Sequence, residues 1–196
     1  LICYISGWSD EVGIQQQLTS AVASDSIVPT TRITALASQS QYIWAVTEPS
    51  WKPYGTPTGF KKTVDDGANY TDYTSQVTDR THSTYADLSS LDTLANLDWV
   101  VVGYSAKFNG VFLEPKNVNL NASVIAAAYW NGTAWTAMTA YNRKPYDHTA
   151  VGGKTLARPG AIAWEGQAGD WATSTIGGTS AYWIRLTMSA ALSATV

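Results

Sequence analysis

Three carboxylic acids in the C-terminal half, Glu114, Glu165 and Asp170, are of the residue type that could hydrolyse a glycosidic bond. Such chemistry needs two carboxyl groups on opposite sides of the scissile bond, one of which donates a proton. The spacing of the three acids does not establish their separation, and some of the 15 Asp and Glu residues in the chain will approach one another by chance. We therefore interpret these acids as surface carboxylates and expect no catalytic residue.

The sequence also offers few candidate residues for binding a metal or a cofactor. His82 and His148 are the two histidines of the chain, and neither has a second ligand at the spacing typical of a metal site. Asp65, Asp66 and Asp72 could offer oxygen ligands to calcium, but they lack the regular alternation of a calcium-binding loop. The chain contains neither a glycine-rich phosphate loop nor a G-x-S-x-G motif. The sequence therefore predicts no metal, no cofactor and no enzyme activity.

Tryptophan is the residue type that most strongly suggests a binding surface. The chain has 9 Trp, and an exposed indole ring on a β-sandwich can stack against a sugar while nearby Asn and Asp accept its hydroxyl hydrogen bonds. We expect Trp130 and Trp135 to pack within a sheet or at a subunit interface. Four residues remain as candidate contacts to a partner protein or a glycan: Trp183, Arg185, Trp171 and Trp51.

The composition restricts the classes of partner. Charged residues make up 14% of the chain, well below the roughly 25% usual for soluble proteins. With a net charge of -3 and scattered Lys and Arg, the chain has no basic field for nucleic acid. No apolar run approaches the roughly 20 residues that span a bilayer. The single cysteine, Cys3, excludes an internal disulfide, and we expect it to be a small apolar residue in a strand.

The first 59 residues are expected to form an N-terminal arm that docks the protein onto a partner. A short strand is expected at Leu1–Ile5, and Ser9 is a suitable N-cap for a helix with an apolar face at Ile14, Leu18, Ala21 and Val22. Gln41–Thr47 has the composition of a strand. Pro and Gly residues between positions 49 and 59 then indicate a connector. We therefore divide the chain into an arm, residues 1–59, and a domain, residues 60–196.

The domain is expected to consist mainly of β-strands. A strand near Tyr70–Val77 is followed by a helical turn containing Leu88, Leu91 and Leu94. Trp99–Tyr104 and Gly110–Leu113 are apolar runs joined by a turn, which predicts a β-hairpin. Another short strand is expected at Gly160–Trp164. Together these elements favour an antiparallel, all-β fold.

The most specific local pattern is the pair of apolar runs on either side of Asn131-Gly132. This dipeptide readily forms a two-residue type I′ turn, which would place Trp130 opposite Thr133 and Ala128 opposite Trp135. Both faces of this hairpin are apolar, so it is expected to be central in a covered sheet or to meet another subunit.

A last strand is expected at Ala181–Met188. Alternation places Tyr182, Ile184, Leu186 and Met188 on the core face. Trp183 and Arg185 fall on the opposite, outward face, where they could stack as a cation–π pair.

Several of these segments resemble a recurring β-sandwich module in the structural proteins of tailed bacteriophages. They are Asp98–Tyr104, Phe108–Val111, Ala128–Trp135, Gly169–Ala172 and Gly177–Leu186. The resemblance covers about Asp65 to Thr195, roughly two thirds of the chain, and residues 1–59 do not share it. It implies a jelly-roll-like β-sandwich and association with a virion, and it implies no particular position in the particle.

The expected function is therefore that of a bacteriophage structural protein. It would be a capsid decoration or cement protein, or a tail-associated subunit, made in the host cytoplasm and carried in the virion. Few charges and many aromatic residues suit a surface that neighbouring capsid or tail subunits cover, so we expect a homo-oligomer. The alternative is a carbohydrate-binding host-recognition module that uses outward Trp residues on a host surface glycan.

Overall fold

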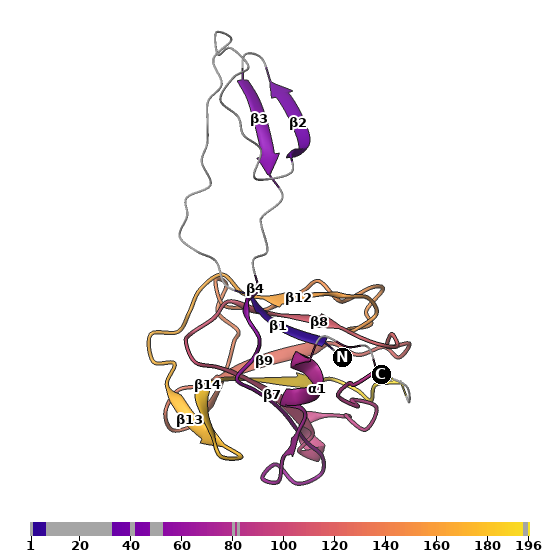
Figure 1. The fold of residues 1–196 in the computed structure, drawn as a ribbon, viewed down its shortest axis with the longest axis vertical. Coiled ribbons are helices and arrows are strands. Elements are labelled where there is room, and N and C mark those ends of the chain that lie inside the picture. Colours follow the sequence, from indigo (N-terminus) through magenta and orange to yellow (C-terminus); the bar gives the residue numbers. More distant parts are fainter. Residues whose placement is uncertain are drawn as a thin grey trace. The chain divides into compact units, whose positions relative to one another are not determined.

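The computed structural model shows an antiparallel β-sandwich, which confirms the predicted fold class (Figure 1). It describes residues 2–6, 33–39, 42–47, 53–79, 81, 83–193 and 196, with side chains described from residue 55 onward. The chain divides into two compact units, one made of Leu1–Trp8 with Pro53–Val196 and the other of Ser9–Lys52. The first unit holds both large sheets.

The first large sheet has five antiparallel strands. Their order is β11 (Tyr146–Asp147), β12 (Gly160–Ala163), β8 (Gly110–Glu114), β1 (Ile2–Ser6) and β4 (Pro53–Gly55). Strand β1 lies between β8 and β4, and its register pairs Cys3 with Leu113. Cys3 thus lies in a strand, as predicted. Because β1 is an interior strand of this sheet, the predicted domain boundary at residue 59 is wrong: residues 1–8 and 53–59 belong to the sandwich unit.

The second large sheet contains seven strands. Their order is β10 (Trp135–Ala137), β9 (Ile125–Trp130), β14 (Thr179–Met188), β7 (Trp99–Tyr104), β5 (Gly59–Thr63) and β6 (Thr71–Asp72), and β13 (Thr173–Ile176) also pairs with β14. The ten-residue β14 contacts three other strands, so it organises this sheet. The turn between β13 and β14 is Gly177-Gly178, and both glycines have positive φ, as a type I′ turn requires.

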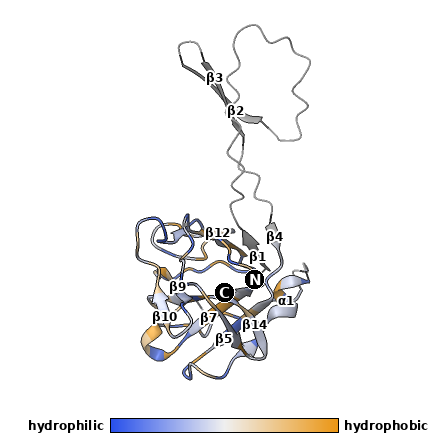
Figure 2. Cartoon of the chain, turned by 90° about the vertical axis from the view of Figure 1, so that its left-hand side faces the viewer, coloured by the Kyte–Doolittle hydropathy of each residue, from blue (hydrophilic) through white to orange (hydrophobic). Residues whose placement is uncertain are grey.

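Few elements lie outside these two sheets. A short helix, α1 (Thr74–Thr78), and a 3₁₀ turn, η1 (Leu94–Asn96), precede β7. In the second unit, β2 (Ile33–Gln39) and β3 (Tyr42–Thr47) form an antiparallel hairpin, and β3 matches the strand predicted at 41–47. The helix predicted after Ser9 lies outside the described residues. Hydrophobic and hydrophilic residues are interspersed throughout the described part of the sandwich (Figure 2). No helix in that part is long and apolar enough to cross a membrane.

The main core lies between the two sheets. Val102 and Ile184 from the second sheet and Val111 and Ile162 from the first are fully buried and belong to one apolar cluster. Three aromatic rings join this core: Phe108 lies 5.6 Å from Trp164 and 5.0 Å from Trp171, measured between ring centroids. Burial of such large rings supplies much of the apolar area that stabilises a sandwich of this size.

The predicted pairing of the 99–104 and 110–113 segments is wrong. Both segments are strands, β7 and β8, but β7 pairs with β5 and β14 whereas β8 pairs with β1 and β12. The chain therefore crosses from one sheet to the other between them. Apolar runs on both strands are consistent with either arrangement, because both strands are buried.

The hairpin at Asn131-Gly132 exists, but its predicted register is wrong. Trp130 pairs with Trp135 and Ala128 with Ala137, so the loop has four residues rather than two. The Oδ1 atom of Asn131 accepts hydrogen bonds from the backbone N–H groups of Thr133, at 3.0 Å, and Ala134, at 2.8 Å. This side-chain closure competes with the type I′ turn, because an Asn side chain can replace backbone hydrogen bonds in a turn.

The segment predicted as a strand near Tyr70–Val77 is also different. It holds the two-residue strand β6 and then the helix α1, whose Val77 is fully buried. The helical turn predicted around Leu88, Leu91 and Leu94 corresponds to two short turns. In the first, the backbone N–H of Leu91 donates to the carbonyl of Leu88, and the second is η1, which begins at Leu94. Gly160–Trp164 contains β12, as predicted.

Candidate binding site

Strand β14 presents its side chains alternately to the two faces of the second sheet. Ile184, Leu186 and Met188 belong to the main core, and Tyr182 packs against it, as the alternation predicted. Trp183 and Arg185 lie on the other face, which we call the outer face of this sheet. A second apolar cluster covers part of the outer face. Its buried members are Trp99, Val101, Ala181 and Trp183, and Tyr70, Trp135 and Ile176 pack against them.

Trp183 lies on the face that alternation predicted, but it is fully buried there, which conflicts with a role as an exposed partner or glycan contact. The register places Gly59, Gly103 and Trp183 in one row across three strands. Because these two glycines have no Cβ, the indole ring lies flat against the sheet, and its Nε1 donates to the Ser174 carbonyl at 2.9 Å. Alternation assigns a residue to a face correctly, but it does not show what folds over that face. Trp183 is therefore a packing residue.

Arg185 has different aromatic partners from the one predicted. The carbon Cζ of its guanidinium lies 5.0 Å from the ring centroid of Trp99 and 5.2 Å from that of Trp135. Both distances lie within the range of cation–π interactions. The predicted stack of Arg185 with Trp183 is thus replaced by a position between two other indole rings.

The two rings beside Arg185 are themselves held by neighbours. Trp99 is almost fully buried, and its Nε1 donates to the hydroxyl of Tyr70 at 3.1 Å. Trp135 is half-buried and meets the half-buried ring of Trp130 edge to face, at a centroid distance of 5.6 Å. These contacts fix the two indole rings on either side of the guanidinium.

Arg185 carries a charge that the described residues do not neutralise. Its Nε is buried and has no hydrogen-bond partner. Within the described part of the chain, no ion pair or hydrogen bond uses the Arg185 side chain. Burial lowers the pKa of Arg185, and Tyr70 opposes that shift. The guanidinium remains protonated, because arginine is a far stronger base than the other side chains.

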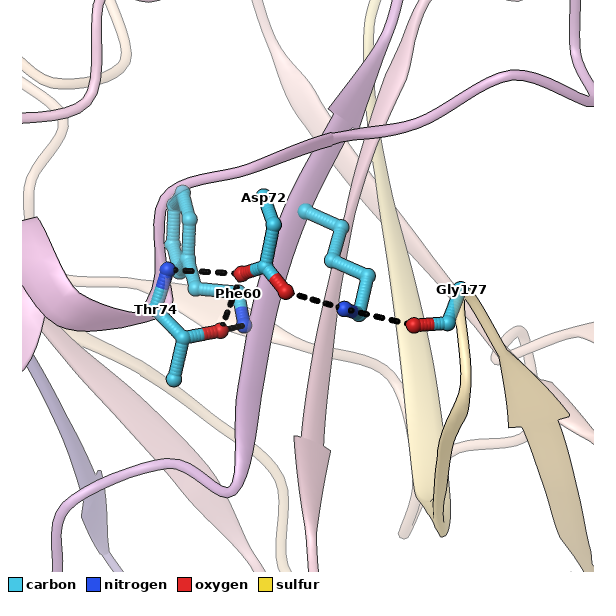
Figure 3. Close-up of polar contacts among 5 residues, drawn as sticks. Phe60, Asp72, Thr74 and Gly177 are labelled. Atoms are coloured by element: carbon cyan, nitrogen blue, oxygen red, sulfur yellow. Dashed lines mark hydrogen bonds and ion pairs between the residues drawn. The ribbon is translucent and has the colours of Figure 1, made fainter.

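A second cation on the outer face, Lys61, is neutralised within the protein (Figure 3). Lys61 is 1% exposed, and its Nζ forms an ion pair with Asp72 and donates to the Gly177 carbonyl at 3.3 Å. Asp72 also accepts a hydrogen bond from the backbone N–H of Thr74, whose hydroxyl oxygen in turn accepts one from the Phe60 N–H. Burial raises the pKa of Asp72, but hydrogen bonds from Lys61 and Thr74 outweigh this and lower it overall.

The register shows how the two cations are related. Lys61 lies opposite Val101, and Val101 lies opposite Arg185 on the next strand. The same row continues to Ala128 on β9 and to Ala137 on the edge strand β10. A buried and paired ammonium group and a half-buried guanidinium thus share one row, separated by one valine.

The remaining predicted contacts do not join this site. Trp171 is 3% exposed in the main core, where its Nε1 donates to the Trp183 carbonyl, so its predicted role as an outer contact conflicts with its burial. Trp51 lies outside the described residues. Trp99 and Tyr70 were not predicted as site residues, because only the pairing of β7 with β14 brings Trp99 beside Arg185. No pattern within either strand could have indicated that pairing.

Several of the carboxylates considered at the start have separate partners, and His82 lies outside the described residues. Asp170 accepts a hydrogen bond from the Tyr129 hydroxyl at 3.0 Å, and burial and this contact raise the pKa of Tyr129. Asp66 accepts a hydrogen bond from Asn69 and Asp72 pairs with Lys61, so these two acids, which were considered as calcium ligands, have separate partners. Among the described residues, no three His, Cys, Asp or Glu side chains gather as metal ligands.

Comparison with known proteins found no matching family model, no matching curated protein and no matching solved structure.

Proposed function

We propose that this chain is a non-catalytic structural subunit of a tailed-bacteriophage particle. It would be a capsid decoration or cement protein, or a tail-associated subunit, and would work by binding capsid or tail proteins and further copies of itself. The segments that resemble the phage module contain β7 and overlap β9, β10 and β14, and these four strands form most of the second sheet. Low charge supports the proposal, because burying few Lys and Glu residues at subunit contacts costs little desolvation.

The observation that carries the proposal is the pairing of β1 with β4. Ser6 lies opposite Pro53, so the unit Ser9–Lys52 leaves the sandwich and returns to it at neighbouring positions of one sheet. The sandwich can therefore serve as a rigid base, and the inserted unit as the element that docks onto an adjacent virion protein. Many identical copies on one particle would add avidity to each modest contact.

The same pairing allows a clean test. Paired residues in neighbouring strands lie about 4.5–5.5 Å apart at Cα, so a short Gly-Ser linker between Trp8 and Pro53 can replace residues 9–52 without separating β1 from β4. We expect the shortened chain to keep the far-ultraviolet circular dichroism spectrum of a β protein and a cooperative unfolding transition. It should lose its place in the particle.

The assay is incorporation during infection. Tagged full-length and shortened chains are produced together at equal levels, and particles purified by density gradient are probed for each tag. We expect full-length chain in the particles and at least a tenfold deficit of the shortened chain. Absence of the full-length chain from particles would remove the assignment to a virion. Equal incorporation of both chains would remove the docking role of residues 9–52.

A second candidate function, glycan recognition on the host surface, is favoured by the aromatic residues on the outer face. Trp135 and Trp130 are half-buried beside Arg185, so parts of both indole rings remain open to a ligand. Calorimetric titration of the protein with oligosaccharides from the host surface tests this function. We expect saturable binding that Trp135→Ala weakens at least tenfold, and no saturable heat would end this candidate.

A further inference from the structure

Arg185 differs from Lys61, Lys62 and Lys107 in having no oxygen partner among the described residues. Lys61 pairs with Asp72, and Lys62 donates to the Asp87 carbonyl and to Ser90. Lys107 likewise donates to two backbone carbonyls, those of Ala168 and Gly169. Within the described residues, the Arg185 side chain has no such hydrogen bond, although aromatic rings hold it in place. Removing charge from water without a partner is costly, so this position is suited to an anion supplied by a ligand.

The orientation of the guanidinium defines where that anion would bind. Trp99 and Trp135 both lie within stacking distance of the guanidinium, and Nε is buried. Nε is the one side-chain nitrogen of Arg185 that is buried without a partner among the described residues, and the side chain as a whole is half-buried, so the two Nη atoms are the nitrogens left to meet a ligand. Their N–H groups form the planar fork that matches the two oxygens of a carboxylate.

The surroundings provide room and apolar surface for a ring attached to that carboxylate. The row of residues continues from Arg185 to Ala128 and the exposed Ala137 at the sheet edge, and these have only methyl side chains. The half-buried rings of Trp130 and Trp135 lie on the neighbouring row. A sugar ring has an apolar face that stacks on indole and hydroxyl groups that remain in water.

We propose that Arg185, Trp135 and Trp130 form a binding site for an acidic sugar, with the sugar carboxylate on the Nη atoms of Arg185 and its ring against the two indoles. This inference rests on the second proposed function, glycan recognition, and is independent of particle assembly. A single negative charge fits better than a polyphosphate, because the next cation in the row, Lys61, is buried and already paired with Asp72.

The test uses the full chain and three small probes: methyl glucuronide, methyl glucoside and acetate. Binding is followed by calorimetry and by the NMR signals of the Trp indole N–H groups and the buried Arg185 Nε–H. We expect the glucuronide to bind at least tenfold more tightly than either other probe, and to shift the signals of Trp130, Trp135 and Arg185. The NMR shifts need no variant, so they test the site even if a substitution at Arg185 prevents folding.

Two variants separate the charge at this site from cation–π contacts in general. Arg185→Gln should weaken glucuronide binding at least tenfold. Lys116→Gln is the matched control, because Lys116 stacks on Tyr85 at 4.1 Å outside the site and its loss should leave binding unchanged. Circular dichroism and urea unfolding establish that both variants are folded.

The possible failures are distinguishable. Equal affinity for glucoside and glucuronide would overturn the preference for a carboxylate and leave glycan recognition standing. Acetate binding as tight as that of the glucuronide would overturn the contribution of the sugar ring. No binding of any probe or of larger oligosaccharides would overturn both the site and glycan recognition, and would leave the assembly proposal untouched.

Discussion

Gly103 lies beneath the indole ring of Trp183, and substitution by Ala would place a methyl group in contact with that ring. An added Cβ at Gly103 would lie 2.6 Å from Cζ3 of Trp183, whereas carbon atoms pack at about 3.5–4.0 Å. The ring would therefore have to move by about 1 Å. It is fully buried and its Nε1 is hydrogen-bonded to the Ser174 carbonyl, so it cannot move freely. We predict that Gly103→Ala destabilises the sandwich.

The expected loss follows from two opposing effects. Overpacking in a core costs about 1–3 kcal/mol, whereas replacing Gly by Ala within a strand regains about 0.5–1 kcal/mol of backbone entropy. The net loss in the free energy of unfolding should be about 1–2 kcal/mol. The matched control is Gly169→Ala, because an added Cβ at Gly169 meets no atom within 4 Å. That control should change the free energy of unfolding by less than about 0.5 kcal/mol.

Urea unfolding followed by circular dichroism measures both free energies. A double-mutant cycle with Trp183→Leu tests the cause, because removal of the indole ring should abolish most of the cost of Gly103→Ala. A coupling energy of about 1 kcal/mol or more is expected. Wild-type stability of Gly103→Ala, or an unchanged cost in the Trp183→Leu background, would refute the packing of Trp183 against Gly103.

Two further predictions concern polar contacts. Asp72→Asn leaves the buried ammonium of Lys61 without its carboxylate. It should lower the free energy of unfolding by about 1–3 kcal/mol. This is less than the loss expected for a fully buried ion pair, because Asp72 is half exposed. The pKa of Asp72 is lowered from 3.8 in the folded protein. The carboxylate therefore contributes its full stabilisation above pH 3.8, and this stabilisation is lost as the pH falls through the lowered pKa. The difference between wild type and Asp72→Asn in urea unfolding should therefore shrink below about pH 4, and a pH-independent difference would exclude the ion pair as its cause. Asn131→Ala removes the acceptor that closes the β9–β10 loop and should cost about 1 kcal/mol in the same assay, whereas Asn131→Asp should cost less.

Local patterns in the sequence predicted much of the fold because they depend on neighbours in the chain. Alternation in β14 placed Ile184, Leu186 and Met188 in the core correctly, and Trp183 and Arg185 on the opposite face. The strands at 99–104 and 110–114 were also located correctly. These predictions required only the period of two residues that every strand has.

Long-range pairing decided the remaining features, and no short segment encodes it. The strands β7 and β8 were assigned to one hairpin, although each is apolar enough to belong to either sheet. The Asn131-Gly132 dipeptide suited a two-residue turn, but φ is positive only at Gly132, and the Asn131 side chain closes a longer loop. Turn geometry of this kind depends on which of two competing sets of hydrogen bonds the flanking strands support.

The candidate site shows most clearly which features local patterns predict and which depend on long-range strand pairing. Residue types and alternation were enough to bring Arg185 and an aromatic partner into consideration. Two features depend on the pairing of four strands, β7, β14, β9 and β10, in one register: Trp183 is covered, and Trp99 and Trp135 flank the guanidinium. A side chain's face follows from its own strand, whereas its exposure and its partners follow from the strands beside it.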